Sequence, residues 1–328
     1  MDTAPRARAA ALLASTLLTT YAATLVLSGA RNPLDQPGKP LSAALTIYPD
    51  GWANGILLAC SAIAFVAALW LFRRPAAATW VAGGAIVALI ALMDSSVLIA
   101  FGYLPAVLVG TLIGSDVNLS VLATPGLGVQ LGVLATIAAF GWVIAGRVRA
   151  GLRAVEAVED PEERARRLAA VTARTRRWTH LAIEAPLVYA LTRVLMFFHV
   201  PGFDMFAFGE PILWAGLGLA VSASLGAWLT WGLIRPWGEV FPRWLPGLRG
   251  RRVPPGLAVV SALLVAVMVA TAAKDLFGEI GDGWSALRDW PLVTLPMLLW
   301  PLWAAALAVA AVNYGIRRRL SRPETVPV

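Results

Sequence analysis

The sequence predicts an all-α fold, a polytopic transmembrane helix bundle of about eight spanning helices with both termini in the cytoplasm. Three observations lead to this prediction. Of the 328 residues, 59% are hydrophobic and 14% are charged, whereas soluble domains have about 45–50% and about 25%. Apolar stretches of about 20 residues, the length that crosses a bilayer, recur along the chain. The basic residues gather in every second gap between these stretches.

The first apolar stretch follows Arg6 and Arg8, as the apolar part of a signal peptide would. Its apolar run is longer than the roughly 7–15 residues of a signal peptide, and no clear Ala-x-Ala site closes it, so we expect a retained helix. Trp and Tyr residues lie near the ends of most later stretches, where their rings favour the membrane interface. The predicted spans are 9–30, 52–72, 78–101, 126–146, 179–200, 211–234, 255–273 and 291–315.

The 27 Lys and Arg residues set the predicted orientation. Both terminal segments and the gaps on their side contain 22 of them, the opposite gaps contain four, and Arg193 lies inside a span. Because cytoplasmic segments are enriched in basic residues, we expect residues 1–328 to form one integral membrane domain with cytoplasmic termini. The preference for Arg, with only Lys39 and Lys274 as lysines, is typical of a GC-rich bacterial genome. The bacterial cytoplasmic (plasma) membrane is therefore the expected location.

Residues 147–178 form a charged connector between two predicted spans. Asp160-Pro161-Glu162-Glu163 is typical of a helix start, because Pro is favoured at the first helical position. We expect a short cytoplasmic helix here. It serves either as a solvated, salt-bridged connector or as a docking site for a protein partner.

Residues 235–254 form a second cytoplasmic loop, in which prolines and glycines exclude a long helix. Aromatic and basic side chains alternate along it, which suits a segment lying on anionic lipid headgroups. We do not expect nucleic acid to bind. The headgroup contacts are expected at Arg235, Arg243, Arg249, Arg251 and Arg252.

Residues 104–115 are apolar but too few to cross a bilayer. The segment is expected to be re-entrant or interfacial, and the sequence leaves both open.

Charged side chains inside spans are functional candidates, since each costs about 2.5–3.5 kcal/mol to insert. Asp94, Glu184 and Arg193 meet this description. The positions of Asp94 and Arg193 along their helices place both in the outer third of the bilayer. We therefore predict an ion pair between them.

The fifth predicted span has its polar residues on one half of a helical wheel, which we expect to face the bundle interior. This half forms either a structural network or a cavity for a ligand, ion or substrate. Two acidic residues after the span are candidates for the outer mouth, where they are either solvated or capture cations. The cavity candidates are Asp94, Glu184, Tyr189, Thr192, Arg193 and His199, and the mouth candidates are Asp204 and Glu210.

No reaction signature is present: the chain has no Gly-x-Ser-x-Gly, Walker A, His-Glu-x-x-His or Cys-x-x-Cys motif. Cys60 cannot hold a metal alone, and His180 and His199 lie near opposite ends of one predicted helix. We expect no metal or cofactor. Non-enzymatic handling of a small molecule, lipid or ion is the leading hypothesis. The alternatives are an intramembrane enzyme for a lipid or isoprenoid, with Glu184 or Asp94 as acid or base, and a structural or assembly protein.

Residues 236–254, Leu299-Trp300-Pro301-Leu302-Trp303 and Arg317-Arg318-Arg319 resemble uncharacterised multi-pass membrane proteins of high-GC actinobacteria. The resemblance covers mainly residues 186–319. It implies a membrane fold and supplies no activity or site.

Overall fold

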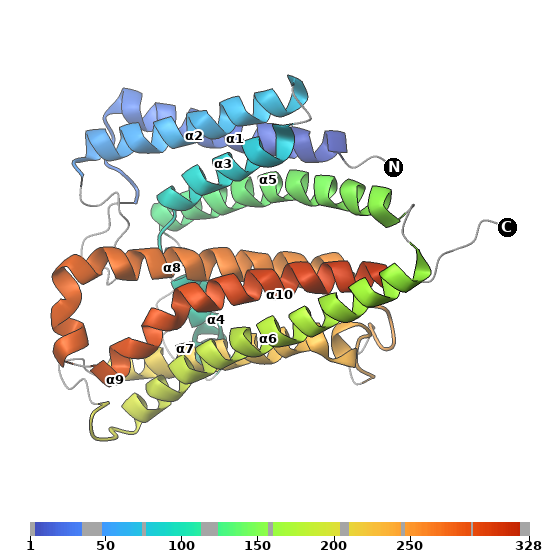
Figure 1. The fold of residues 1–328 in the computed structure, drawn as a ribbon. Helices are drawn as coiled ribbons and strands as arrows, with labels where there is room; N and C mark the ends of the chain where they lie inside the picture. Colours follow the sequence, from blue (N-terminus) through green and yellow to red (C-terminus); the bar gives the residue numbers. More distant parts are fainter. Residues whose placement is uncertain are drawn as a thin grey trace. The chain divides into compact units, whose positions relative to one another are not determined.

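The computed structural model describes residues 4–34, 48–73, 77–112, 124–156, 160–203, 210–243, 247–289 and 291–321. Within these residues the regular structure is helical (Figure 1), and the only β-type pairing is an isolated bridge between Val240 and Arg252. The predicted all-α fold is confirmed.

In the described part of the chain, seven helices are long and apolar enough to cross a membrane, and a bent helix pair would make an eighth span. This number agrees with the eight predicted spans and makes the chain a multi-pass membrane protein. The seven are Pro5–Ser28, Asp50–Arg73, Pro125–Leu152, Pro161–Phe197, Gly216–Ile234, Pro255–Leu276 and Pro291–Leu320.

The chain divides into two compact units, Met1–Ala100 with Asn118–Val158, and Phe101–Val117 with Glu159–Val328. Whether they act as the single domain that the sequence predicts stays a prediction.

The first unit contains α1 (Ala4–Ser28), α2 (Asp50–Arg73), α3 (Ala78–Leu92) and α5 (Pro125–Glu156). α1 packs against α2 and α5, and α3 packs against the same two helices. Many buried side chains are small, because small side chains let apolar helices approach closely without help from the hydrophobic effect. Ala11, Ala22, Ala64, Ala68 and Ala82 are fully buried.

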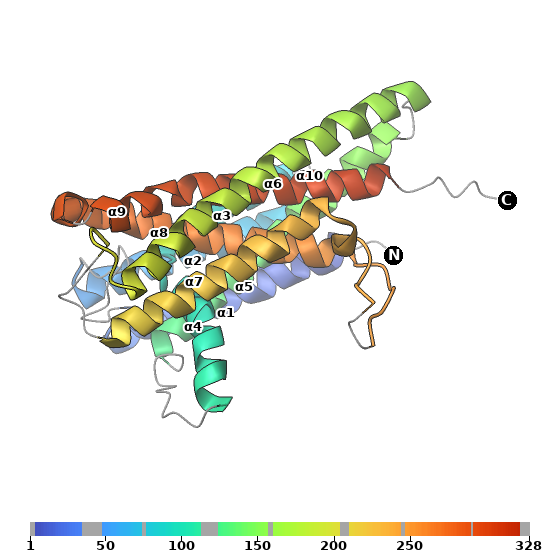
Figure 2. The same ribbon diagram turned by 90° about the horizontal axis from the view of Figure 1, so that it is seen from below.

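The second unit contains α6 (Pro161–Phe197), α7 (Glu210–Trp231), α8 (Pro255–Asp289) and α10 (Trp300–Leu320). α6 packs against α7 and α10, and α10 also packs against α8 (Figure 2). The short α9 (Pro291–Thr294) and a 3₁₀ helix, Leu295–Leu299, lead into α10. The two polar clusters described below lie at opposite ends of α10, and the first of them also includes the C-terminal half of α6.

The predicted short helix within 147–178 is wrong, because no separate helix forms there. α5 continues to Glu156, and α6 runs without interruption from Pro161 through the fifth predicted span to Phe197. The predicted start is confirmed, with Asp160 extended (φ −64°, ψ 145°) and Pro161 at the first helical position. No Gly or Pro occurs between residues 162 and 185, so nothing ends the helix at the membrane boundary.

The third predicted span, 78–101, is broken. α3 ends at Leu92, and α4 (Ser96–Leu112) starts after a bend of 75° between Thr79–Leu92 and Ser96–Gly102. Residues 104–112 are the second half of α4 rather than a separate segment, and 113–115 lie outside the described residues. Whether this half is re-entrant or interfacial stays a prediction.

The segment after the seventh predicted span also differs from expectation. α8 continues beyond residue 273 as far as Asp289.

Candidate functional site

The C-terminal half of α6 brings together three of the predicted cavity residues. Tyr189 and Thr192 are buried and Arg193 is half-buried. The Arg193 guanidinium carbon lies 4.8 Å from the centroid of the Tyr189 ring. The Tyr189 ring also makes an edge-to-face contact with the Trp300 ring, with 5.7 Å between the ring centroids and 68° between the planes. Trp300 opens α10, so the contact joins α6 to the start of α10.

The polar contacts of the Arg193 guanidinium within the described residues are to sulfur. Nη1 lies 3.7 Å from the Met196 sulfur and Nη2 lies 3.5 Å from the Met297 sulfur. A thioether sulfur is a weak acceptor and carries no charge. Tyr189, Arg193, Met196, Met297 and Trp300 are called the Arg193 cluster below.

Gly216 of α7 closes the cluster on a third side. A Cβ atom at this position would lie 3.2 Å from the Met196 methyl carbon and 3.7 Å from Cδ of Arg193. The absence of a side chain therefore lets α7 approach the aliphatic part of Arg193.

Two N–H groups of the Arg193 cluster have no hydrogen-bond partner among the described residues. They are Nε of Arg193 and Nε1 of Trp300, whose side chain is 6% exposed. A buried donor without an acceptor costs about 1–3 kcal/mol. Among the described residues of the second unit, no carboxylate forms an ion pair with Arg193. The cluster therefore combines a positive charge with two buried donors that the described part of the chain leaves unpaired.

The other predicted residues of the fifth span lie elsewhere. Thr192 donates its hydroxyl hydrogen to the Tyr189 carbonyl at 2.7 Å, within its own helix. Glu184 is exposed, and so is His199, which follows the end of α6 with a φ of 52°. Glu184 and His199 are thus exposed on the second unit, and whether they face the interior of the whole bundle stays a prediction.

The packing of α6 explains why Glu184 is exposed. Its buried face consists of Ala182, Ala185, Pro186, Tyr189 and Met196. Small side chains on this face permit close helix contact, and Glu184 lies about 100° or more away from most of them at 100° per residue. Asp204 lies outside the described residues. Glu210 begins α7, and its side chain also lies outside them.

Asp94, in the first unit, forms hydrogen bonds at the break between α3 and α4. Its carboxylate Oδ1 accepts a hydrogen bond from the Ser96 backbone N–H at 2.8 Å, and its own N–H donates to Oε1 of Gln130 at 3.2 Å. The Gln130 amide also donates to the Leu92 carbonyl at 3.2 Å. Asp94 thus caps the N–H of Ser96, the first residue of α4, and fully buried Gln130 ties the end of α3 to Asp94. Asp94 and Arg193 belong to different units, and the predicted ion pair between them stays a prediction.

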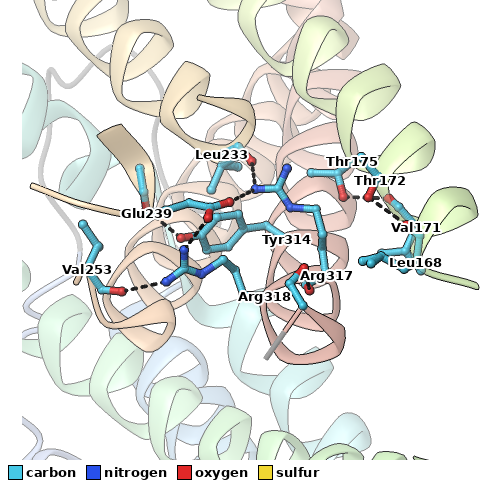
Figure 3. A network of polar contacts seen from close by, with 12 residues as sticks. Leu168, Val171, Thr172, Thr175, Leu233, Glu239, Val253, Tyr314, Arg317 and Arg318 are labelled. Carbon is cyan, nitrogen blue, oxygen red and sulfur yellow. Dashed lines mark hydrogen bonds and ion pairs between the residues drawn. The ribbon is translucent and has the colours of Figure 1, made fainter. Parts of the chain in front are cut away.

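A second polar cluster lies at the C-terminal end of α10 (Figure 3). Arg317 and Arg318 each lie 2.8 Å from one oxygen of the Glu239 carboxylate. Arg317 also donates to the Leu233 carbonyl at 3.1 Å, and Arg318 to the Val253 carbonyl at 3.4 Å. These three charged residues are called the Glu239 clamp below.

Tyr314, one turn before the clamp, completes this contact. Its side chain is fully buried and its hydroxyl donates to the Gly238 carbonyl at 2.7 Å. A Cβ atom at Gly238 would overlap the backbone of Gly232, so only glycine allows the chain to fold back here. Sequence reasoning missed these residues. The available signal was that Glu239 is the only acidic residue within 235–254.

The loop that carries Glu239 is folded. The Val240–Arg252 bridge is flanked by hydrogen bonds from the Phe241 N–H to the Arg251 carbonyl and from the Val253 N–H to the Glu239 carbonyl, both 2.9 Å. The five arginines predicted to meet headgroups are all exposed. One of them, Arg235, stacks over the Trp231 ring at 4.2 Å.

The charged half of α6 has an exposed hollow of about 590 Å³, lined by Ala169, Thr172, Ala173, Arg176, Arg177 and His180. Docking of a protein partner within 147–178 stays a prediction. Among the described residues, no group of His, Cys, Asp and Glu could hold a metal ion.

Comparison of the chain with protein-family models, curated proteins and solved structures gives no match. The resemblance to actinobacterial membrane proteins therefore stays a prediction, and the arguments on function depend on the geometry alone.

Proposed function

We propose that this multi-pass membrane protein binds and handles, without chemical conversion, a small molecule or lipid that carries an anionic group. The anionic group binds at the Arg193 cluster. The observation that carries the proposal is the pair of buried, unpartnered donors, Nε of Arg193 and Nε1 of Trp300. A phosphate or carboxylate oxygen supplies both the acceptor and the negative charge that these groups need.

The surroundings of Arg193 also suit the apolar part of such a ligand. Tyr189, Met196, Met297 and Trp300 present aromatic rings and thioethers, which adapt to irregular apolar shapes. The guanidinium carbon lies over the Tyr189 ring, and Nε of Arg193 keeps an N–H that can donate to an oxyanion. A cation in apolar surroundings binds an anion more strongly than it would in water, because the local dielectric constant is low.

A purely structural role makes a different prediction. In that case the guanidinium stabilises the α6–α10 contact through Tyr189 and the two sulfurs, and interacts with the nearby C-terminus of α6. Added anions would then change nothing. The two interpretations therefore differ in the response to a ligand.

The test measures thermal unfolding of the purified protein in a neutral detergent with three added probes. Dihexanoyl phosphatidate represents a lipid phosphate, decanoate represents a carboxylate, and dihexanoyl phosphatidylcholine is the probe without net charge. We expect at least one anionic probe to stabilise the protein, by about 2.7 kcal/mol at 100 times its Kd. The difference between the first two probes assigns the group.

Arg193→Gln and Trp300→Phe should each reduce this stabilisation. Arg174→Gln is the matched control, since Arg174 is an exposed arginine of the same helix. Equal stabilisation of wild type and Arg193→Gln, or no stabilisation by either anion, would overturn the proposal.

The orientation and the location belong to the same proposal. The distribution of Arg and Lys supports cytoplasmic termini and a bacterial cytoplasmic membrane. Reporter fusions after residues 150, 205, 245 and 282 should report inside, outside, inside and outside. An inverted order would refute the orientation and leave the Arg193 cluster unaffected.

A further inference from the structure

We infer that the folded loop between α7 and α8 is a preformed docking surface for the anionic headgroups of the adjoining membrane leaflet. This surface, called the basic loop below, is independent of the Arg193 cluster. Its basic side chains are Arg235, Arg243, Arg249, Arg251 and Arg252.

The first argument is that the backbone holds these arginines in place. Hydrogen bonds join Phe241 to Gly250 and to Arg251, at 3.2 and 2.9 Å. Gly247 and Gly250 have φ values of 80° and 70°, a conformation that glycine adopts without strain. A surface that is already ordered loses less conformational entropy when it binds than a free segment does.

The second argument concerns charge. Glu239 is the only acidic residue within 235–254, and its two oxygens contact Arg317 and Arg318 of α10. The only carboxylate of the loop is thus occupied by arginines from outside the loop. The five loop arginines stay exposed, with no loop carboxylate left to neutralise them.

The third argument selects a membrane over a soluble partner. The loop joins the end of one span, at Ile234, to the start of the next, at Pro255, so both of its ends lie at the membrane boundary. Val240 is 43% exposed and Leu248 is 39% exposed on the same loop. Guanidinium groups beside exposed apolar side chains suit phosphates and the acyl boundary beneath them.

The experiment is a lipid titration of the full chain, followed by native mass spectrometry. Dioleoyl phosphatidylglycerol is the anionic probe and dioleoyl phosphatidylcholine is the zwitterionic one. Each arginine near an anionic surface contributes about fivefold in affinity at low ionic strength. We expect the triple variant R249Q/R251Q/R252Q to bind phosphatidylglycerol at least about tenfold more weakly than wild type, with phosphatidylcholine unchanged.

The matched control is R149Q/R166Q/R174Q, which removes three exposed arginines from helices expected on the same side of the membrane. It should bind phosphatidylglycerol like wild type. Equal losses in the two triple variants would show a general charge effect and overturn the proposal.

A third result would also overturn it. If R249Q/R251Q/R252Q keeps its affinity for phosphatidylglycerol but loses binding of soluble polyglutamate, the surface serves an acidic protein. Tryptophan fluorescence and size-exclusion profiles of all variants show whether each is folded before the titration.

Discussion

The Arg193 cluster and the Glu239 clamp each contain an arginine beside a tyrosine, but they differ in the partners of the arginine. In the clamp, one carboxylate contacts two arginines at 2.8 Å each, and backbone carbonyls take further N–H groups. In the Arg193 cluster the described acceptors are two sulfurs, and two donors are left over. The satisfied arginine network of the clamp holds elements together, whereas the donors left over in the Arg193 cluster are the basis of the proposed anion binding.

The largest effect is expected when the clamp loses its carboxylate. Glu239→Gln leaves Arg317 and Arg318, each 13% exposed, without a negative partner. The expected cost is roughly 2–3 kcal/mol in the free energy of unfolding, below the roughly 3–5 kcal/mol of a fully buried pair because Glu239 is 40% exposed. Denaturation in mixed micelles measures it.

Glu162→Gln is the control for this measurement. Glu162 pairs with Arg166 at 3.5 Å, with both side chains more than three-quarters exposed, so its removal should cost less than about 0.5 kcal/mol. Equal effects of the two substitutions would show that the clamp contributes no more than a surface pair.

A smaller loss is expected from Tyr314→Phe. The change removes one hydroxyl from a fully buried ring and leaves the Gly238 carbonyl without this donor. The expected cost is about 1–2 kcal/mol, measured in the same way. Cleavage of the basic loop by protease should also become faster, because Tyr314 ties the loop to α10. Unchanged stability and cleavage would mean that the two arginines alone hold the loop.

Two substitutions of Asp94 test whether this residue stabilises the first unit by its negative charge or by capping a backbone N–H. Asp94→Ala should cost about 1 kcal/mol, because the Ser96 N–H loses its acceptor. Asp94→Asn should cost only a few tenths of a kcal/mol, since Asn caps helices as well as Asp does. A loss from Asn as large as the loss from Ala would assign the role to the negative charge, and would favour the predicted ion pair with Arg193.

The sequence predicted the spans well because about 20 apolar residues have few other stable environments. It predicted helix ends poorly, because Ala, Glu and Arg in 161–178 continue a helix as readily as the apolar residues after them. The break at Asp94 was not predicted for a related reason. Asp94-Ser95-Ser96 is typical of a helix start, but inside an apolar stretch Asp94 was interpreted as a buried charge within one continuous span.

The candidate sites were less accessible to sequence reasoning. A helical wheel placed Glu184 with Tyr189 and Arg193, but the packing of Ala182 and Ala185 decides which side of α6 is buried. The sequence suggested no role for Trp300, which lies inside the predicted span 291–315. Its contact with Tyr189 joins residues 111 positions apart, and no periodicity encodes such a pairing. The contact between Glu239 and Arg317 spans 78 positions and was missed for the same reason.

A small effect on stability is also expected from Arg193→Met, and this variant tests the difference between the Arg193 cluster and the Glu239 clamp. Arg193→Met removes the cation–π contact with Tyr189, worth about 0.5–2 kcal/mol, but also removes a partly buried charge and the unpaired Nε donor. Replacing a buried charge by an apolar side chain of similar volume is often neutral or stabilising. In the absence of ligand, the free energy of unfolding should therefore change by less than about 1 kcal/mol, while the response to phosphatidate or decanoate disappears. A loss as large as that of Glu239→Gln would make Arg193 a structural residue like Arg317, since only a residue with satisfied partners costs so much to remove. Neutral stability together with a lost ligand response is the pair of results that a binding residue produces and a structural one cannot.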